Sequence, residues 1–113
     1  MSETLFEKII KKEIPANIIY EDDISIVIKD INPQAPTHLL IIPKKVIPKL
    51  SDANQEDQAI LGHLMLVAGK MSRQLELDDT FRLIVNNGAK AGQSVFHLHL
   101  HLMSGRVLNW PPG

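Results

Sequence analysis

The segment from about Gln55 to Leu75 has the spacing of apolar residues that is typical of an amphipathic helix. Its apolar stripe consists of Ile60, Leu61, Leu64, Val67, Ala68, Met71 and Leu75. His63 lies on the flank of this stripe, and we interpret it as a structural residue. The stripe predicts that one face of a long helix packs against the rest of the chain.

A shorter helix is predicted near the N-terminus. The tetrapeptide Thr4-Leu5-Phe6-Glu7 has the spacing of a capping box, in which a glutamate follows the N-cap threonine by three residues. Apolar residues then continue the helical pattern as far as Ile10, and the helix is expected to end before Pro15.

Five segments have the composition and spacing of β-strands. They are Asn17–Tyr20, Ile24–Lys29, His38–Ile42, Thr80–Val85 and Val95–Met103. Residues 86–94 are predicted to form a hairpin connection, and Lys44–Leu50 is predicted to be irregular. The order of helix, strands, helix and strands indicates an α+β fold with a mainly antiparallel five-stranded sheet, in a single domain of residues 1–113.

Three histidines alternate with apolar residues in the last predicted strand. Because side chains alternate across a strand, His97, His99 and His101 share one face, about 7 Å apart. The other face carries the predicted core residues Phe96, Leu98, Leu100 and Leu102. Neighbouring groups that can both become positively charged are unfavourable unless an anion lies over them. The row therefore predicts a functional site.

Two kinds of chemistry use a row of imidazoles. Zinc accepts three histidines and a water, but three ligands on a line do not converge on a tetrahedral ion. Alternatively, a neutral imidazole attacks phosphorus and forms a reactive phosphoimidazole, while neighbouring histidines donate hydrogen bonds to the phosphoryl oxygens. The second interpretation is favoured by the residues before the strand, since Asn86-Asn87-Gly88 and Gly92-Gln93-Ser94 supply amide, hydroxyl and backbone donors.

Composition narrows the classes of partner. The formal net charge is −1, from 12 basic and 13 acidic residues, which argues against non-specific binding to nucleic acid or to an acidic membrane. The chain has no cysteine, so disulfides and thiolate metal sites are excluded. The N-terminus does not have the pattern of a signal peptide, and the apolar runs are too short to cross a bilayer, so we expect a cytoplasmic protein.

The motifs together resemble the histidine-triad (HIT) superfamily. Residues 97–103 match its pattern of three histidines separated by apolar residues, and the segments 93–95, 30–38 and the final Trp-Pro-Pro-Gly resemble its nucleotide-binding branch. The resemblance runs from about Phe6 to the last residue. Related nucleotidyl transferases have glutamine in place of the third histidine, so His101 favours hydrolysis.

The missing cysteine and the linear arrangement of the three histidines predict that catalysis requires no metal or other cofactor. The resemblance implies an α+β homodimer with purine nucleoside phosphoramidase activity. His99 would be the nucleophile, its ring oriented by a backbone carbonyl, with His97, His101 and His38 as its supporting cluster. Asp30 would accept the ribose hydroxyls. The implied walls around the base are Phe6, Ile14 and Ile31, and the implied phosphate and leaving-group contacts are Asn86, Gly92, Gln93 and Ser94.

Several of these residues also have ordinary structural interpretations. Ile14 and Ile31 would suit the core of any fold, and Asp30 would suit a cap on the turn before Pro33. Two positions depart from relatives: Ile28 stands where an aromatic residue is frequent, and Val46 stands where some members have another histidine.

Two further hypotheses stay open beside the phosphoramidase. One is a nucleotide-binding or partner-binding module whose catalysis is vestigial, and the other is a histidine metalloprotein. The homodimer is also expected from the long helix, because Met65 and Leu66 fall outside its apolar stripe and Gly62 and Gly69 allow close approach of another helix. The sequence does not indicate whether the C-terminal tail around Trp110 contributes to this dimer interface or extends to the active site of the other subunit.

Overall fold

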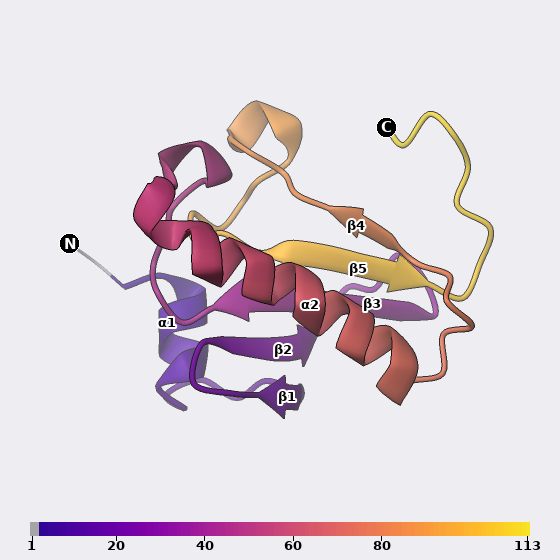
Figure 1. Ribbon diagram of the computed structural model, residues 1–113, viewed down its shortest axis with the longest axis horizontal. Helices are drawn as coiled ribbons and strands as arrows, with labels where there is room; N and C mark the ends of the chain where they lie inside the picture. The colour runs from indigo at the N-terminus through magenta and orange to yellow at the C-terminus, as the bar shows by residue number, and fades with distance from the viewer. Residues whose placement is uncertain (1–2) are drawn as a thin grey trace.

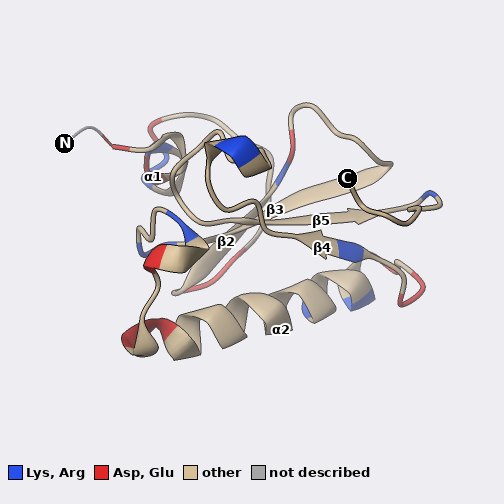
Figure 2. Cartoon of the chain, turned by 90° about the horizontal axis from the view of Figure 1, so that it is seen from above, with Lys and Arg blue, Asp and Glu red and all other residues tan. Residues whose placement is uncertain are grey.

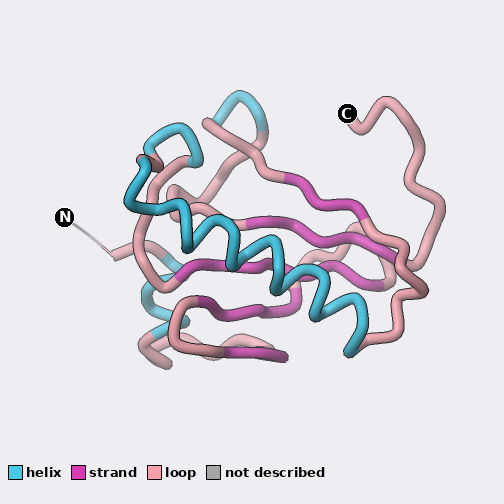
Figure 3. Tube along the Cα trace, viewed as in Figure 1, coloured by secondary structure: helices cyan, strands magenta, loops and turns pink. Residues whose placement is uncertain are grey.

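The computed structural model describes residues 3–113, which form two α-helices, five strands and three short 3₁₀ turns (Figure 3). The α-helices are α1 (Leu5–Ile10) and α2 (Gln58–Gln74). The strands are β1 (Ile18–Glu21), β2 (Ser25–Lys29), β3 (Thr37–Pro43), β4 (Arg82–Ile84) and β5 (Leu100–Ser104). The 3₁₀ turns are η1 (Leu50–Asp52), η2 (Gln55–Asp57) and η3 (Ala89–Ala91).

The strands form one sheet in the order β1-β2-β3-β5-β4, and every neighbouring pair is antiparallel. The predicted α+β fold with a five-stranded antiparallel sheet is therefore confirmed. In the centre of the sheet, Leu40 of β3 lies opposite His101 of β5. His38 lies opposite Met103 and is therefore a diagonal neighbour of His101.

The two helices cover opposite faces of the sheet (Figures 1 and 2). The face under α2 carries the larger core. From the helix it includes Leu64, Val67 and Met71, and from the histidine-containing segment 97–103 it includes Leu98, Leu100 and Leu102. The face under α1 carries a smaller core made of Phe6, Ile9, Ile26, Ile28, Leu40 and Ile42. Basic and acidic residues are scattered over both layers (Figure 2).

The capping box and the apolar stripe that the sequence predicted for the two helices are both present in the structure. Thr4 and Glu7 make both hydrogen bonds of the predicted capping box. Most of the predicted stripe of α2 is buried or half-buried, whereas Leu75 is partly exposed at its C-terminal end. Met65 and Leu66 are 60% and 75% exposed, as expected for residues outside the stripe. None of the helices in residues 3–113 combines the length and the apolar character that crossing a bilayer requires.

The last strand differs from its prediction. It begins at Leu100 and not at Val95, and Phe96, predicted to lie in the core, is 43% exposed. The physical reason lies in β3, whose pairing with β5 runs only as far as Ile41 opposite Leu100. At the end of β3, the carbonyl of Pro43 accepts a hydrogen bond from the side chain of His97. Residues 95–99 therefore leave the sheet, and β4 is correspondingly shorter than its predicted range.

Candidate active site

The histidines gather on the face of the sheet that α1 covers. Leu98, Leu100 and Leu102 point into the larger core, so the alternating side chains point to the other face. There the ring of Phe6, from α1, stands edge-on to the rings of His97 and His99, with centroid distances of 5.8 and 4.9 Å. The rings of His99 and His101 are 5.0 Å apart. The sequence-predicted triad is thus one contiguous cluster.

His97 is fully buried and its two ring nitrogens are both hydrogen-bonded. Nε2 lies 2.7 Å from the carbonyl oxygen of Pro43, and since a carbonyl only accepts, Nε2 carries the proton. In the neutral ring Nδ1 is then an acceptor, and the hydroxyl of Thr4, 2.9 Å away, donates to it. Burial lowers the pKa of His97 below its ordinary value, which keeps this ring neutral.

His99 is oriented by the backbone of its own segment. Its Nδ1 lies 2.7 Å from the carbonyl oxygen of His97 and donates to it. Burial lowers the pKa of His99, so the ring is neutral and Nε2 carries a free lone pair. A neutral imidazole held with Nδ1 protonated is the form that attacks an electrophile through Nε2.

A chain of hydrogen bonds sets the protons on His38 and His101. The backbone N–H of Gln34 donates to Nδ1 of His38 at 3.0 Å, so the proton of His38 is on Nε2. That Nε2 lies 2.9 Å from Nδ1 of His101 and donates to it. The proton of His101 is therefore on Nε2. Burial, with the neighbouring His99 and His38, lowers the pKa of His101 to about 4. His101 is thus a neutral ring whose outer nitrogen is a hydrogen-bond donor.

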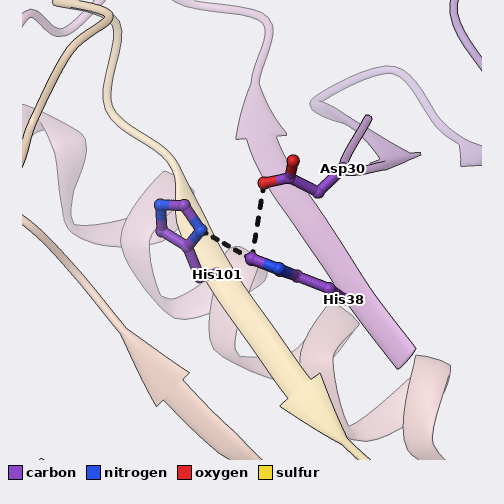
Figure 4. Close-up of side chains that lie close together, drawn as sticks. All are labelled: Asp30, His38 and His101. Atoms are coloured by element: carbon purple, nitrogen blue, oxygen red, sulfur yellow. Dashed lines mark hydrogen bonds and ion pairs between the residues drawn. The ribbon is translucent and has the colours of Figure 1, made fainter. Parts of the chain in front are cut away.

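Asp30 follows β2 and closes this cluster from the side (Figure 4). One carboxylate oxygen accepts from the backbone N–H of Asn32, which is the turn cap that the sequence also suggested. The other oxygen lies 3.4 Å from Nε2 of His38. A pocket of about 280 Å³ beside Asp30 and His38 is also lined by Leu39 and Leu75, and His97, His99 and His101 do not line it. Asp30 therefore has one oxygen engaged in the turn and one facing the histidines.

The three apolar residues that the resemblance implied as walls around the nucleotide base lie in different environments. Phe6 is buried in the smaller core, and Ile14 packs at the edge of that core. Ile31 is 99% exposed, so its interpretation as a core residue is wrong. It follows Asp30 in a bend that turns its side chain away from both cores.

The loop between β4 and the histidines is organised by Gln93. Its buried side chain accepts from the N–H of Gly88 and donates to the carbonyls of Pro48 and Val95. Its backbone N–H donates to the carbonyl of Gly88. The donors of Gln93 are thus used within the protein, and the residue braces the loop.

The remaining predicted loop residues lie beside this brace. Gly92 has φ of 103°, a left-handed conformation that suits glycine. A Cβ on Gly92 would lie 3.4 Å from the side-chain nitrogen of Asn86, so these two residues are adjacent. Ser94 is exposed immediately before the histidine segment.

One group of side chains has ligand atoms of the kinds that bind metal ions. The candidate ligand atoms of Asp30, His38 and His101 all lie within 4.8 Å of one another (Figure 4). However, Nδ1 of His38 accepts from the N–H of Gln34, so Nε2 is protonated and has no lone pair for an ion. A histidine that binds a metal usually donates its second N–H to an acceptor, and the surroundings of His38 are the reverse. The proton arrangement does not fit a metal at this trio.

Sequence reasoning missed three contributors to the cluster. Thr4 was identified only as a helix cap, yet its hydroxyl also reaches His97, 93 residues away in the chain. The N–H of Gln34 and the carbonyl of Pro43 act through backbone atoms, which a residue type does not report. The capping box was the available signal for Thr4, but it did not indicate a contact with a histidine.

Comparison with known families gives a match over most of the chain. Residues 11–108 match the family model of the HIT domain. An uncharacterised HIT-like protein of Synechocystis sp. is 58% identical over 111 residues, which cover 98% of this chain and 97% of that protein. A 14 kDa zinc-binding protein of Zea mays is 49% identical over 99% of this chain and 89% of its own length.

Solved structures agree with this match. A HIT family hydrolase from Legionella pneumophila superposes with a TM-score of 0.95 and 45% identity, covering 98% of this chain and all of the other. A histidine triad nucleotide-binding protein from Candida albicans has a TM-score of 0.81 and 33% identity, covering 96% of this chain and 83% of the other. The chain therefore has the HIT-like fold that its sequence pattern suggested.

Proposed function

Because the chain belongs to the histidine-triad (HIT) family, we propose that it hydrolyses purine nucleoside 5′-phosphoramidates at the α-phosphorus. The observation that carries the proposal is the hydrogen bond from Nδ1 of His99 to the carbonyl of His97. It leaves Nε2 of a neutral ring free to attack. The hydrolase and nucleotide-binding descriptions of the similar structures point in the same direction.

The proposed reaction has two displacements at phosphorus. In the first, Nε2 of His99 forms a bond to the α-phosphorus, the phosphorus–nitrogen bond breaks, and the leaving nitrogen takes up a proton and departs as an amine. In the second, water attacks phosphorus, the bond to His99 breaks, and the proton that water gives up replaces the one consumed. The net change is one phosphoramidate and one water converted into a nucleoside monophosphate and an amine.

The neighbouring side chains support these steps. His101, with its proton on Nε2, donates to a phosphoryl oxygen as negative charge develops there. His97 holds the backbone that orients His99, and His38 sets the proton on His101. The hydroxyl of Ser94, exposed beside the histidine segment, delivers the proton to the leaving nitrogen.

The nucleoside would lie between Asp30 and α1. The carboxylate oxygen of Asp30 that is not held by Asn32 is available to the ribose hydroxyls. Ile31 is fully exposed beside Asp30 and offers an apolar surface to the base, with Phe6 and Ile14 at the far wall. Asn86 and Gly92 contact the phosphate, while Gln93 supports the loop that carries them.

A homodimer through α2 is part of the proposal. Met65 and Leu66 are exposed on this helix, and a Cβ on Gly62 would meet no atom within 4 Å. An apolar cavity of about 220 Å³ opens between α2 and the edge strand β4, lined in part by Met65 and Leu83. An apolar helix face beside an open strand edge is a self-complementary surface when two copies meet on a two-fold axis.

Turnover of adenosine 5′-phosphoramidate tests the function. The wild type should release adenosine monophosphate, and His99→Ala should lose nearly all turnover yet still bind the monophosphate, because the ribose and base contacts lie elsewhere. With chiral thiophosphoramidate substrates hydrolysed in oxygen-18-labelled water, two inversions should give net retention at phosphorus. Net inversion, or full turnover by His99→Ala, would disprove the covalent histidine mechanism. Binding without turnover by the wild type would favour the binding-module hypothesis.

A further inference from the structure

We propose that Thr4 is a positioning residue for the reaction, because its hydroxyl fixes His97 and through His97 the nucleophile His99. The proposal deepens the function proposed above and rests on it. Its starting point is one oxygen atom with two partners: Oγ1 of Thr4 accepts from the N–H of Glu7 and lies 2.9 Å from Nδ1 of His97.

The directions of these bonds follow from the groups involved. The backbone N–H of Glu7 only donates, so Thr4 accepts there at 3.0 Å. Nδ1 of His97 has no proton, because Nε2 donates to Pro43, so Thr4 donates its hydroxyl proton to Nδ1. A hydroxyl has one donor and two acceptor positions and therefore satisfies both bonds at once. An ionised carboxylate would cap the helix equally well but would have no proton to give.

The segment that carries His97 depends on such bonds. Residues 95–99 lie outside the sheet, which β5 joins only from Leu100. What ties the middle of this segment to the fold is the bond from Leu98 N–H to the carbonyl of Ile47 and the two bonds of the His97 ring. One of these three links runs to Thr4. The ring of His97 therefore serves as an anchor for its own backbone.

That backbone is what orients the nucleophile. The carbonyl of His97 accepts from Nδ1 of His99 at 2.7 Å. Helix α1 adds a second restraint, since Phe6 stands edge-on to His99 two residues after the cap. A shift of His97 would tilt the carbonyl and with it the lone pair on Nε2 of His99. The position of the attacking atom, Nε2 of His99, therefore depends on Thr4 at the start of α1, through the side chain and the carbonyl of His97.

Three variants separate the two tasks of the hydroxyl. Thr4→Ser keeps both bonds, whereas Thr4→Gly is a well-tolerated helix cap and leaves Nδ1 of His97 without a partner on residue 4. Glu7→Ala is the matched control: it removes the carboxylate that accepts from the N–H of Thr4, the other half of the capping box, and leaves the hydroxyl and His97 in place.

The kinetic readout is the change in kcat against KM on adenosine 5′-phosphoramidate. Thr4→Gly should lower kcat about tenfold or more with KM nearly unchanged, because misplacing a reacting group by about 1 Å costs rates of that order. Thr4→Ser and Glu7→Ala should retain the wild-type kcat. Equal kcat for Thr4→Gly and Thr4→Ser would overturn the proposal, as would an equal loss in Thr4→Gly and Glu7→Ala.

Nitrogen-15 NMR of the histidine rings in the wild-type protein gives a second readout. It requires no substrate, and it does not depend on whether a variant folds. In the wild type, His97 should have its proton on Nε2 and an accepting Nδ1, and His99 should have its proton on Nδ1. In Thr4→Gly, the proton of His97 should stay on Nε2, and the Nδ1 signal should shift to that of a nitrogen that accepts no hydrogen bond. A wild-type His97 with its proton on Nδ1 would refute the role of Thr4 even if turnover is normal. Absent turnover with the expected ring protons would instead refute the proposed function and leave the positioning intact.

Discussion

The backbone N–H of Gln34 donates to Nδ1 of His38 at 3.0 Å and so determines which nitrogen of His38 carries its proton. Because Nε2 of His38 then donates to His101, one loop amide determines the protonation of two histidines. This arrangement favours hydrogen-bond donation to a substrate at His101 over metal binding, since a ligating nitrogen needs a lone pair.

We therefore expect catalysis to proceed without a metal. Activity on a nucleoside phosphoramidate should survive prolonged treatment with EDTA followed by desalting into metal-free buffer. The histidines and loop donors themselves stabilise the charge at phosphorus. Metal analysis of the same sample is the control. Loss of activity on chelation, restored by zinc, would support the metalloprotein hypothesis.

Ser94 is expected to act on the leaving group. Ser94→Ala should lower kcat and kcat/KM together, by about 100-fold or more as is typical for removing a proton donor, with little change in affinity for the monophosphate product. Steady-state kinetics with substrates whose amines differ in basicity measure this effect. The loss should be smallest for the amine that leaves most easily. A fall in monophosphate affinity alone would show that Ser94 binds the nucleotide instead.

The exposed face of α2 is expected to hold two subunits together. Sedimentation equilibrium at low micromolar concentration should give a dimer for the wild type and a monomer for Leu66→Glu, because a carboxylate would be buried in the apolar interface. Leu75→Glu is a suitable control, since Leu75 is partly exposed at the end of the same helix. A monomeric wild type would refute the dimer, and a dimeric Leu66→Glu would refute only the α2 interface.

Stability should fall as the pH is lowered from 7.5 to 5. Burial lowers the pKa values of His97, His99 and His101 in the folded protein, so the unfolded chain binds more protons below its histidine pKa of 6.5. The free energy of unfolding therefore decreases as pH falls through that value, by at most about 1.4 kcal/mol per pH unit for each histidine, and by less for the partly exposed His101.

Urea unfolding at a series of pH values measures this dependence. His97→Gln should reduce the slope relative to the wild type, since one titrating ring is removed. A free energy of unfolding that is constant between pH 7.5 and 5 would show that the buried rings do not resist protonation. Carboxylates whose pKa is lowered, such as Asp22, affect stability only at more acidic pH.

The sequence predicted the elements that depend on local pattern. The stripe of α2 and the capping box at Thr4 both act between residues a few positions apart, so they were found correctly. The start of β5 was placed five residues too early, because alternation at Val95 and His97 satisfies the strand rule whether or not a neighbouring strand is available. Phe96 was assigned to the core for the same reason.

Most of the proton arrangement of the histidines was beyond sequence reasoning. The resemblance implied a backbone carbonyl beside His99, and the carbonyl of His97 accepts from its Nδ1. The protons of His38 and His97 depend on the N–H of Gln34 and the carbonyl of Pro43, and the type of a residue does not indicate such backbone contacts. The interpretation of Ile31 as a core residue failed for another reason. An apolar residue in an irregular loop belongs to no periodic pattern, so the sequence does not indicate whether its side chain is buried or exposed. The cluster could be located from the sequence, but the state of each ring required the tertiary structure.

The division of the protein into a larger and a smaller core means that the histidine cluster and the bulk of the fold need not melt together. Helix α1 has six residues, too few to persist without its contacts, and it packs on the smaller core and the histidines, not on the larger core. Local opening of this helix would release Thr4 and Phe6 from the histidines while α2 and its core stay intact. Heat inactivation should then precede loss of the helical circular dichroism signal, and amide exchange at Lys8 and Ile9 should be faster than at Leu64.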